Sequence, residues 1–326
     1  MGPLVLGAPA KVNLFLRVLG RRADGFHEVR TLLQAIDLHD EVRVELGGEG
    51  IDLSVVGQEP CVPRENLAWI AAERFAAATG LEAGVRVRLE KRIPAGAGLG
   101  GGSSDAGAVL RALCRLTGVE ERDPAVTGIA RGLGSDVPFF LCGSPLALAT
   151  GRGDALEPLA PLPEAHLVVC LPPVHVSTAS AYGALARARE EEIRDVADRE
   201  VADREEGAPT RQAARGTTGR PRAFPEGEVG AGAPTAARPR TWSEALSHMG
   251  NDFETIVARS NPPVARSLEA LLDQGATGAL LCGSGAACFG FFPHRIAATA
   301  AADVLTERLG WSCVPVRTLV DVPRPA

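Results

Sequence analysis

The chain has 326 residues, a formal net charge of −6, and 45% apolar and 23% charged residues, which are ordinary proportions for a globular protein of two domains. An acidic chain without a block of basic residues is unsuited to binding nucleic acid, and its apolar runs are shorter than the about 20 residues of a membrane span. The seven cysteines form no C-x-x-C pair, so we expect reduced thiols in a cytoplasmic protein without a disulfide framework or a zinc site.

Strand and helix patterns alternate along the first half of the chain. Apolar residues recur at every second position in 12–18, and further strand-like runs cover 29–38, 41–46 and 51–56. Asn66 and Gly80 are typical of the start and the end of a helix. The strand expected near 85–92 is apolar on one face and charged on the other, which indicates an antiparallel or mixed sheet. Two more helices are expected, one after a glycine-rich turn and one over 124–131.

The second half of the chain has a different order of elements. Strands are expected at 167–171, 279–282, 287–292 and 312–319, and helices at 178–188, 264–274 and 296–309. Apart from one additional helix, this is the β-α-β-β-α-β order of ferredoxin-like folds. We therefore expect an α+β protein with domains at 1–165 and 166–326.

Residues 189–241 interrupt this second pattern. The segment begins with charged residues, repeats VADRE in tandem, and continues as an Arg, Gly, Pro and Ala-rich run with few large apolar residues. Such a composition buries too little surface to offset the entropy of ordering, so we expect a disordered insertion. A partner-binding arm is the functional alternative.

Only two of the 34 basic residues are lysines, Lys11 and Lys91. Because arginine is used wherever a general positive charge suffices, a lysine indicates a position that needs a compact ammonium group. We interpret Lys11 as functional on this ground. Lys91 is interpreted as an ordinary charge on the polar face of an alternating strand.

A glycine-rich segment follows that strand and opens a helix. It consists of Pro94, Ala95, Gly96, Ala97, Gly98, Leu99, Gly100, Gly101, Gly102, Ser103 and Ser104. Glycines allow the backbone to approach a ligand closely, and successive N–H groups at a helix N-terminus favour phosphate. The serines could contact phosphate or Mg²⁺, or simply cap the helix, and Asp105 is interpreted as a carboxylate that favours the helix dipole.

Two other phosphate-binding motifs fit this segment poorly. A Walker A motif is excluded because neither lysine follows a glycine. Gly96, Gly98 and Gly101 match the spacing of a dinucleotide fingerprint, but the preceding strand is half-charged and no second strand follows at the expected distance. A dehydrogenase is therefore a weak alternative.

Two shorter motifs complete the pattern. Gly134-Ser135-Asp136 places a carboxylate before an apolar run, where it could either perform chemistry or cap a short helix. Gly283-Ser284-Gly285 lies between two apolar strands, where a tight turn explains it in isolation.

Taken together, these segments resemble the GHMP small-molecule kinases, whose phosphate loop reads P-x-x-x-G-L-G-G-G-S-S and whose C-terminal motif contains glycine. The segments APAKVNLFL (8–16), GRRADGFHE (20–28) and GSDVPF (134–139) further resemble the members that act on a cytidine diphosphate substrate. The resemblance covers about residues 4–182 and 242–320. It implies an N-terminal domain of the ribosomal protein S5 domain 2 type, a ferredoxin-like C-terminal domain, ATP with Mg²⁺ along Pro94–Ser104, and a substrate between the domains.

The resemblance also implies roles for individual residues. Asp136 corresponds to the catalytic base and Lys11 to its partner. His27 corresponds to the residue that recognises cytosine, and Phe26 stands where the family commonly has tyrosine. Asn13 would contact the sugar-alcohol part of the substrate. Thr178 and Tyr182, the only tyrosine, match a substrate-lining segment.

The resemblance leaves two rivals to a kinase for a cytidine diphosphate substrate. Another GHMP kinase, acting on mevalonate or homoserine, would not need the segment around His27. A GHMP-like binding module without catalysis would not need both Lys11 and Asp136. No dedicated metal ligands are expected beyond those that accompany ATP, and the protein is expected to be a monomer or a homodimer.

Overall fold

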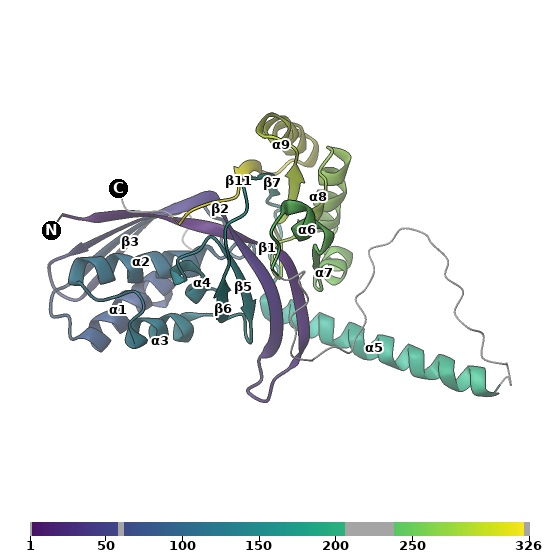
Figure 1. Cartoon of the computed structure of the whole chain (residues 1–326), viewed down its shortest axis with the longest axis horizontal. Coiled ribbons are helices and arrows are strands. Elements are labelled where there is room, and N and C mark those ends of the chain that lie inside the picture. The colour runs from purple at the N-terminus through teal and green to yellow at the C-terminus, as the bar shows by residue number, and fades with distance from the viewer. Residues whose placement is uncertain (1, 58–61, 206–237, 323–326) are drawn as a thin grey trace.

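The computed structural model describes residues 2–57, 62–205 and 238–322, which fold into two units, each a sheet covered by helices (Figure 1). The first unit contains a seven-stranded mixed sheet in which β3-β4-β2-β1-β8 are neighbours and β5 pairs with β2 and β6. Its strands are β1 (Leu4–Arg21), β2 (His27–Leu46), β3 (Ile51–Val56), β4 (Val85–Glu90), β5 (Leu146–Thr150), β6 (Ala155–Pro158) and β8 (Gly250–Asn251). The expected mixed sheet is confirmed.

Helices cover one face of this sheet (Figure 1). They are η1 (Pro63–Glu65), α1 (Leu67–Thr79), α2 (Gly101–Thr117), α3 (Pro124–Leu133) and α4 (Val137–Leu141). The Asn66 side chain accepts the Ala68 N–H at 2.9 Å, and Gly80 ends α1 in the left-handed region. Both ends of α1 therefore form as the sequence predicts. The fully buried Phe75 anchors α1 in the core that it shares with α2 and the sheet.

The strand β2 is longer than the sequence indicates. A break was expected between 38 and 41, but β2 runs unbroken from His27 to Leu46 and pairs with β1 along nearly its whole length. One of the polar residues in the apparent gap, Asp40, is fully buried and takes its partners from the segment directly after β4. Shifts in the β1–β2 register lie beside Lys11 and Asn13, the part of β1 that reaches the site.

The second unit is a four-stranded antiparallel sheet in the order β11-β7-β10-β9. Its strands are β7 (His166–Cys170), β9 (Ala279–Leu281), β10 (Cys288–Phe292) and β11 (Cys313–Arg317). The helices of this half are α5 (Thr178–Glu205), α6 (Trp242–Ser247), α7 (Glu254–Ser260), α8 (Pro262–Asp273) and α9 (Arg295–Leu309). The strand order 4-1-3-2 is that of a ferredoxin-like sheet, so this expectation is confirmed.

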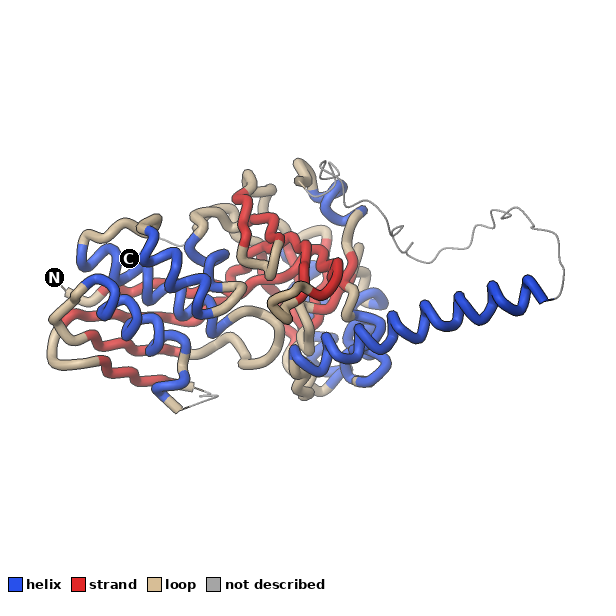
Figure 2. Tube along the Cα trace, turned by 90° about the horizontal axis from the view of Figure 1, so that it is seen from below, coloured by secondary structure: helices blue, strands red, loops and turns tan. Residues whose placement is uncertain are grey.

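The prediction of a disordered insertion at 189–241 is wrong for its first part, 189–205. The helix α5 continues through 189 to Glu205 and projects away from the body of the protein in both views (Figures 1 and 2). The VADRE repeat is rich in alanine, glutamate and arginine, which are good helix formers, so helix propensity outweighs the lack of apolar residues. Residues 206–237 lie outside the described part, and the chain resumes before α6, where Arg238 pairs with Glu157 at 2.7 Å.

The two sheets are joined by more than one connection. β8 comes from the second half of the chain but pairs in parallel with β1. The segment after β11 returns to β2, where Leu319 N–H donates to Ala35 O at 2.9 Å. The division at 165/166 therefore stays a prediction. Among the described helices, none is both long and apolar enough to cross a membrane. The six described cysteines are free.

Candidate active site

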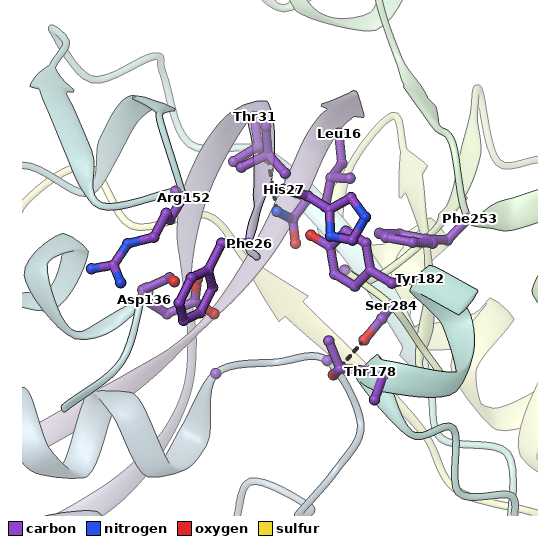
Figure 3. Close-up of a pocket in the computed structure, with 18 of the residues that line it drawn as sticks. Leu16, Phe26, His27, Thr31, Asp136, Arg152, Thr178, Tyr182, Phe253 and Ser284 are labelled. Carbon is purple, nitrogen blue, oxygen red and sulfur yellow. Dashed lines mark hydrogen bonds between the residues drawn. The ribbon is translucent and has the colours of Figure 1, made fainter. Parts of the chain in front are cut away.

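A cavity of about 800 Å³ collects side chains from both halves of the chain (Figure 3). Its walls come from β1, the start of β2, the glycine-rich loop, the turn before α4, the start of α5 and the loop between β9 and β10. The sequence-predicted residues that line it are Lys11, Asn13, Phe26, His27, Gly98, Gly100, Ser103, Asp136, Thr178 and Tyr182. The fold thus brings together residues that the sequence singles out in five separate segments.

Lys11 lies at the buried end of a chain of hydrogen bonds. Its ammonium donates to Asn13 Oδ1 at 2.8 Å, and Asn13 Nδ2 donates to Thr31 Oγ1 at 2.8 Å. Thr31 in turn donates to the Phe15 carbonyl at 2.6 Å. Lys11 and Asn13 point to the same side because they are two residues apart on one strand. With only 4% of Lys11 exposed, the chain fixes where its positive charge sits.

Asp136 faces Lys11 across the cavity. Its carboxylate oxygen Oδ2 lies 3.5 Å from the Lys11 ammonium, and its side chain is 34% exposed. Asp136 occupies the N-cap position of α4 but makes no side-chain capping hydrogen bond. The alternative role of a helix cap is therefore wrong, and the carboxylate is available to a molecule in the cavity.

Glycines permit the close approach of the loops to Lys11. A Cβ at Gly100 would lie 3.1 Å from Lys11 Cγ, and one at Gly283 would lie 3.3 Å from Lys11 Nζ. Both residues also have positive φ, 75° and 55°, which disfavours other residues. A Cβ at Gly98 would overlap the Cys282 carbonyl at 2.1 Å. The Gly283-Ser284-Gly285 motif is therefore part of the wall of the site and not only a tight turn.

The glycine-rich segment divides between the cavity and the protein interior. Gly98, Gly100 and Ser103 line the cavity. Leu99 is 1% exposed and packs in the core, while its carbonyl accepts the Lys11 N–H at 2.9 Å. Ser104 is also buried, and its hydroxyl has no hydrogen-bond partner among the described residues. The remaining predicted loop residues, Pro94, Ala95, Gly96, Ala97, Gly101 and Gly102, do not line the cavity.

Aromatic rings gather at the opposite end of the cavity (Figure 3). His27 stacks on Tyr182 with 4.3 Å between ring centres, and Tyr182 meets Phe253 edge-on at 4.7 Å. Partial burial and the nearby positive charges of Arg21 and Arg189 lower the pKa of His27 below 6.5. Burial, together with the negative charge of Asp136, raises the pKa of Tyr182. Both rings are therefore neutral at pH 7.

Phe26 stands apart from that stack. Its ring is on the Asp136 side of the cavity, and the guanidinium of Arg152 lies over it with 4.8 Å to the ring centre (Figure 3). Phe26 is 52% exposed, so much of the ring remains accessible. An exposed aromatic ring beside a cavity is suited to stacking on a planar ligand.

Thr178 closes another side of the cavity. Its hydroxyl lies 2.9 Å from the Ser284 hydroxyl (Figure 3). This hydrogen bond joins the first turn of α5 to the loop between β9 and β10. Sequence reasoning did not assign Arg21, Arg152 and Phe253 to the lining, and it explained Ser284, in the Gly283-Ser284-Gly285 motif, by a tight turn. No local pattern distinguishes Arg152 and Phe253, because their positions depend on which loops the fold brings to the cavity.

Lys91 and Asp105 are not where the sequence interpretation put them. Lys91 does not lie on the polar face of its strand: only 8% of its side chain is exposed, and its ammonium contacts the carboxylates of Asp40 and Asp105. Asp105 is 1% exposed and is a partner of this ammonium rather than a simple dipole-favouring residue. Residues 85, 87 and 89 face the core, and 91 continues their alternation, so the pattern itself placed Lys91 inside.

The cavity offers oxygen donors to a metal ion. In the part of the chain described, no group of three or more His, Cys, Asp or Glu side chains could hold a metal ion. Mg²⁺ that accompanies a nucleotide takes most of its ligands from phosphate and water, and needs only one or two protein oxygens. The Ser103 hydroxyl and the Asp136 carboxylate line the same cavity and are donors of that kind.

Models of two protein families match the chain. The GHMP kinases N terminal domain matches residues 66–144, and the GHMP kinases C terminal domain matches residues 235–310. The first match includes the glycine-rich loop and Asp136, and the second includes Gly283. Fold and site together define a small-molecule kinase of the GHMP type.

Individual relatives narrow the class. A 4-diphosphocytidyl-2-C-methyl-D-erythritol kinase of Geobacter sp. (strain M21) is 36% identical over 323 residues, covering 98% of this chain and 100% of the relative. A crystal structure of 4-(cytidine 5'-diphospho)-2C-methyl-D-erythritol kinase is 35% identical, with a TM-score of 0.71 and coverage of 96% and 98%. Homoserine kinase from Cytophaga hutchinsonii shares the fold at 20% identity, with a TM-score of 0.64 and coverage of 100% and 98%. The chain belongs to the 4-diphosphocytidyl-2-C-methyl-D-erythritol kinase family.

Proposed function

We propose that this protein transfers the terminal phosphoryl group of ATP to the 2-hydroxyl of 4-diphosphocytidyl-2-C-methyl-D-erythritol, a step of the non-mevalonate isoprenoid precursor pathway. The observation that carries the proposal is the pairing of Lys11 with Asp136, 3.5 Å apart, in a cavity that the glycine-rich loop also lines. Family membership gives the substrate, and the cavity gives the residues that would act on it.

Asp136 is the proposed general base. A sugar-alcohol hydroxyl is hardly ionised at neutral pH, so a carboxylate that accepts its proton contributes about 10²–10⁴-fold in rate. The absence of a capping bond leaves the Asp136 carboxylate, whose Oδ2 faces Lys11, available for this task. Lys11, held by Asn13 at 2.8 Å, provides fixed positive charge where negative charge develops on the reacting oxygen.

The glycine-rich loop is the proposed phosphate site. Its backbone N–H groups and the N-terminus of α2 favour the negative charge of a triphosphate. Ser103 supplies an oxygen donor for the Mg²⁺ that accompanies ATP. When bound, this ion would neutralise charge on the transferred group. Phosphoryl transfer depends mainly on positioning, which agrees with a loop tied to Lys11 through the carbonyl of Leu99.

The far end of the cavity is the proposed cytidine site. His27 is the proposed partner of the cytosine edge, and a neutral imidazole offers it one donor and one acceptor. Phe26 stands apart from the stack of His27 on Tyr182, on the Asp136 side, and is 52% exposed, so the proposed site extends from His27 toward Phe26, the proposed ring for stacking on the base. Asn13 and Thr178 also line the cavity and are the proposed contacts of the erythritol part.

A substrate panel tests the proposal. ADP release is measured with 4-diphosphocytidyl-2-C-methyl-D-erythritol, mevalonate and homoserine, each with ATP and Mg²⁺. Turnover of the cytidyl compound alone is expected. Turnover of mevalonate or homoserine instead would assign another GHMP activity, and no turnover of any compound would favour a binding module. Cytoplasmic location and a monomeric or homodimeric state belong to the same proposal and are tested by fractionation and light scattering.

A further inference from the structure

The glycine-rich loop begins and ends beside a buried ion cluster. Lys91 donates to Asp40 Oδ2 and, at 2.5 Å, to Asp105 Oδ2. Asp40 is fully buried, Asp105 is 1% exposed, and the side chain of Lys91 is 8% exposed. The proposed mechanism uses none of the three.

The cluster connects the residues on either side of the loop. Lys91 lies three residues before Pro94, and Asp105 directly follows Ser104. Asp40 Oδ1 also accepts the backbone N–H groups of Arg92 at 2.5 Å and Ile93 at 2.8 Å. The strand end that enters the loop is therefore attached to β2, and the helix that leaves the loop is attached to that strand end.

Packing brings the two ends into direct contact. A Cβ at Gly101, the first residue of α2, would lie 2.9 Å from Ile93 Cγ2 and 3.5 Å from Asp40 Oδ2. Closing a loop costs conformational entropy, and an interaction between its ends reduces the number of alternative conformations. A buried ammonium between carboxylates is well suited to this because removing one partner leaves an uncompensated charge.

The composition of the chain supports a specific need for lysine at this position. A guanidinium is a planar fork, whereas an ammonium is a compact charge that can donate in several directions at once. Lys91 donates to two carboxylates that come from different elements, β2 and α2. In a chain with only two lysines, both are buried and paired with aspartate.

We infer that Lys91 is a positioning residue for ATP: together with Asp40 and Asp105 it holds the two ends of the glycine-rich loop in the conformation that presents its N–H groups to the phosphates. The inference rests on the proposed ATP-dependent activity. It assigns to Lys91 no contact with either substrate. Its loss should therefore weaken ATP binding and leave the cytidyl site, at the other end of the cavity, unchanged.

The test compares Lys91→Met with Arg88→Met in the full-length protein. Arg88 is on β4, three residues before Lys91, but its side chain is 55% exposed and pairs only with Glu90 among the described residues. Lys91→Met is expected to raise KM for ATP about tenfold or more, equivalent to ~1.4 kcal/mol, with KM for the cytidyl compound within about twofold of wild type. Arg88→Met should change neither. Equal increases of both KM values, or no increase for ATP, would overturn the inference.

A second pair of variants covers the case in which Lys91→Met does not fold. Asp105→Ala removes the acceptor on α2 but leaves Lys91 paired with Asp40, and Asp105→Asn keeps an acceptor oxygen. Asp105→Ala should raise KM for ATP, and the KM for ATP of Asp105→Asn should be close to that of wild type. Equal KM values for the two variants would contradict the proposed positioning role of the Lys91, Asp40 and Asp105 cluster. Calorimetry measures ATP affinity even if the protein turns over no substrate. Failure of the proposed activity can therefore be distinguished from failure of the proposed role of Lys91.

Discussion

The ammonium of Lys11 and the carboxylate of Asp136 lie 3.5 Å apart, although one residue is on β1 and the other is in the turn before α4. Lys11 is held from behind by Asn13, whereas Asp136 is partly exposed to the cavity. This asymmetry suits a fixed cation beside a carboxylate that can meet a substrate hydroxyl. It distinguishes the pair from a surface ion pair, in which both partners are mobile and solvated.

Replacing Asp136 by asparagine should remove the proton acceptor while keeping the shape of the side chain. We expect kcat to fall about 10²–10⁴-fold, with little change in KM for ATP. Lys11→Met should also reduce kcat, and the double variant should lose little more than the worse single variant, because the two groups act as a unit. Asp273→Asn, at an exposed carboxylate that does not line the cavity, is the control and should retain wild-type kcat. An active Asp136→Asn variant would remove the proposed base.

Gly100→Ala should damage the site through the backbone. The residue has φ of 75°, which costs a non-glycine residue about 1–2 kcal/mol, and the new Cβ would press on Lys11 and on Phe140. Loss of most activity is expected in steady-state assays of folded protein. Gly128→Ala is the matched control: Gly128 is within α3 with open space around it, so the change should stabilise the protein by ~0.5–1 kcal/mol and leave activity intact. Wild-type activity of Gly100→Ala would show that the close approach to Lys11 is unnecessary.

Much of the fold follows from local patterns, because each expected element has its own periodicity. The β-α-β-β-α-β order of the second half and the capped α1 are examples. The break expected within β2 shows the limit of this approach. Asp40 resembles a turn residue in sequence, but Lys91 and two backbone N–H groups satisfy its carboxylate inside the protein. A partner so distant along the chain leaves no trace in a local pattern.

The candidate site was predictable to a similar extent. Motifs selected Lys11, Asp136 and the glycines, and composition alone drew attention to both lysines. Lys91 was then given a surface role, although its alternation with Val87 and Leu89 pointed to the interior. Arg152 could not be found from sequence, because it enters the cavity only through the packing of the β5–β6 hairpin. Ser284 lies in a motif that the sequence did show, but a tight turn was a sufficient explanation for that motif in isolation.

His27→Ala should affect the cytidyl substrate rather than ATP. The imidazole stacks on Tyr182 at the end of the cavity away from the glycine-rich loop, and losing its hydrogen bonds to the base should cost ~1–3 kcal/mol. We expect KM for the cytidyl compound to rise about 5- to 150-fold, with KM for ATP unchanged. His39→Ala, at an exposed position of the same strand, is the control. An unaltered KM for the cytidyl compound would remove the cytosine assignment.

Asp105 should make stability depend on pH near neutrality. Burial, opposed by Lys91 and reinforced by the charge of Asp40, raises the pKa of Asp105 to about 7 in the folded protein, against about 3.9 when unfolded. Between these values the folded state retains a proton that the unfolded state has lost, so the stability due to this group falls as pH rises from about 4 through 7. Asparagine does not titrate and is similar in shape to the protonated acid.

The free energy of unfolding of Asp105→Asn should therefore exceed that of wild type. The difference should grow between pH 5 and pH 8.5 and then level off. Urea unfolding at several pH values measures this difference, which is expected to be a few kcal/mol at most. Asp303→Asn, at an exposed position of α9, is the surface control over the same range. If the Asp105→Asn difference did not change with pH, Asp105 would be ionised throughout, and Lys91 would fully compensate both carboxylates.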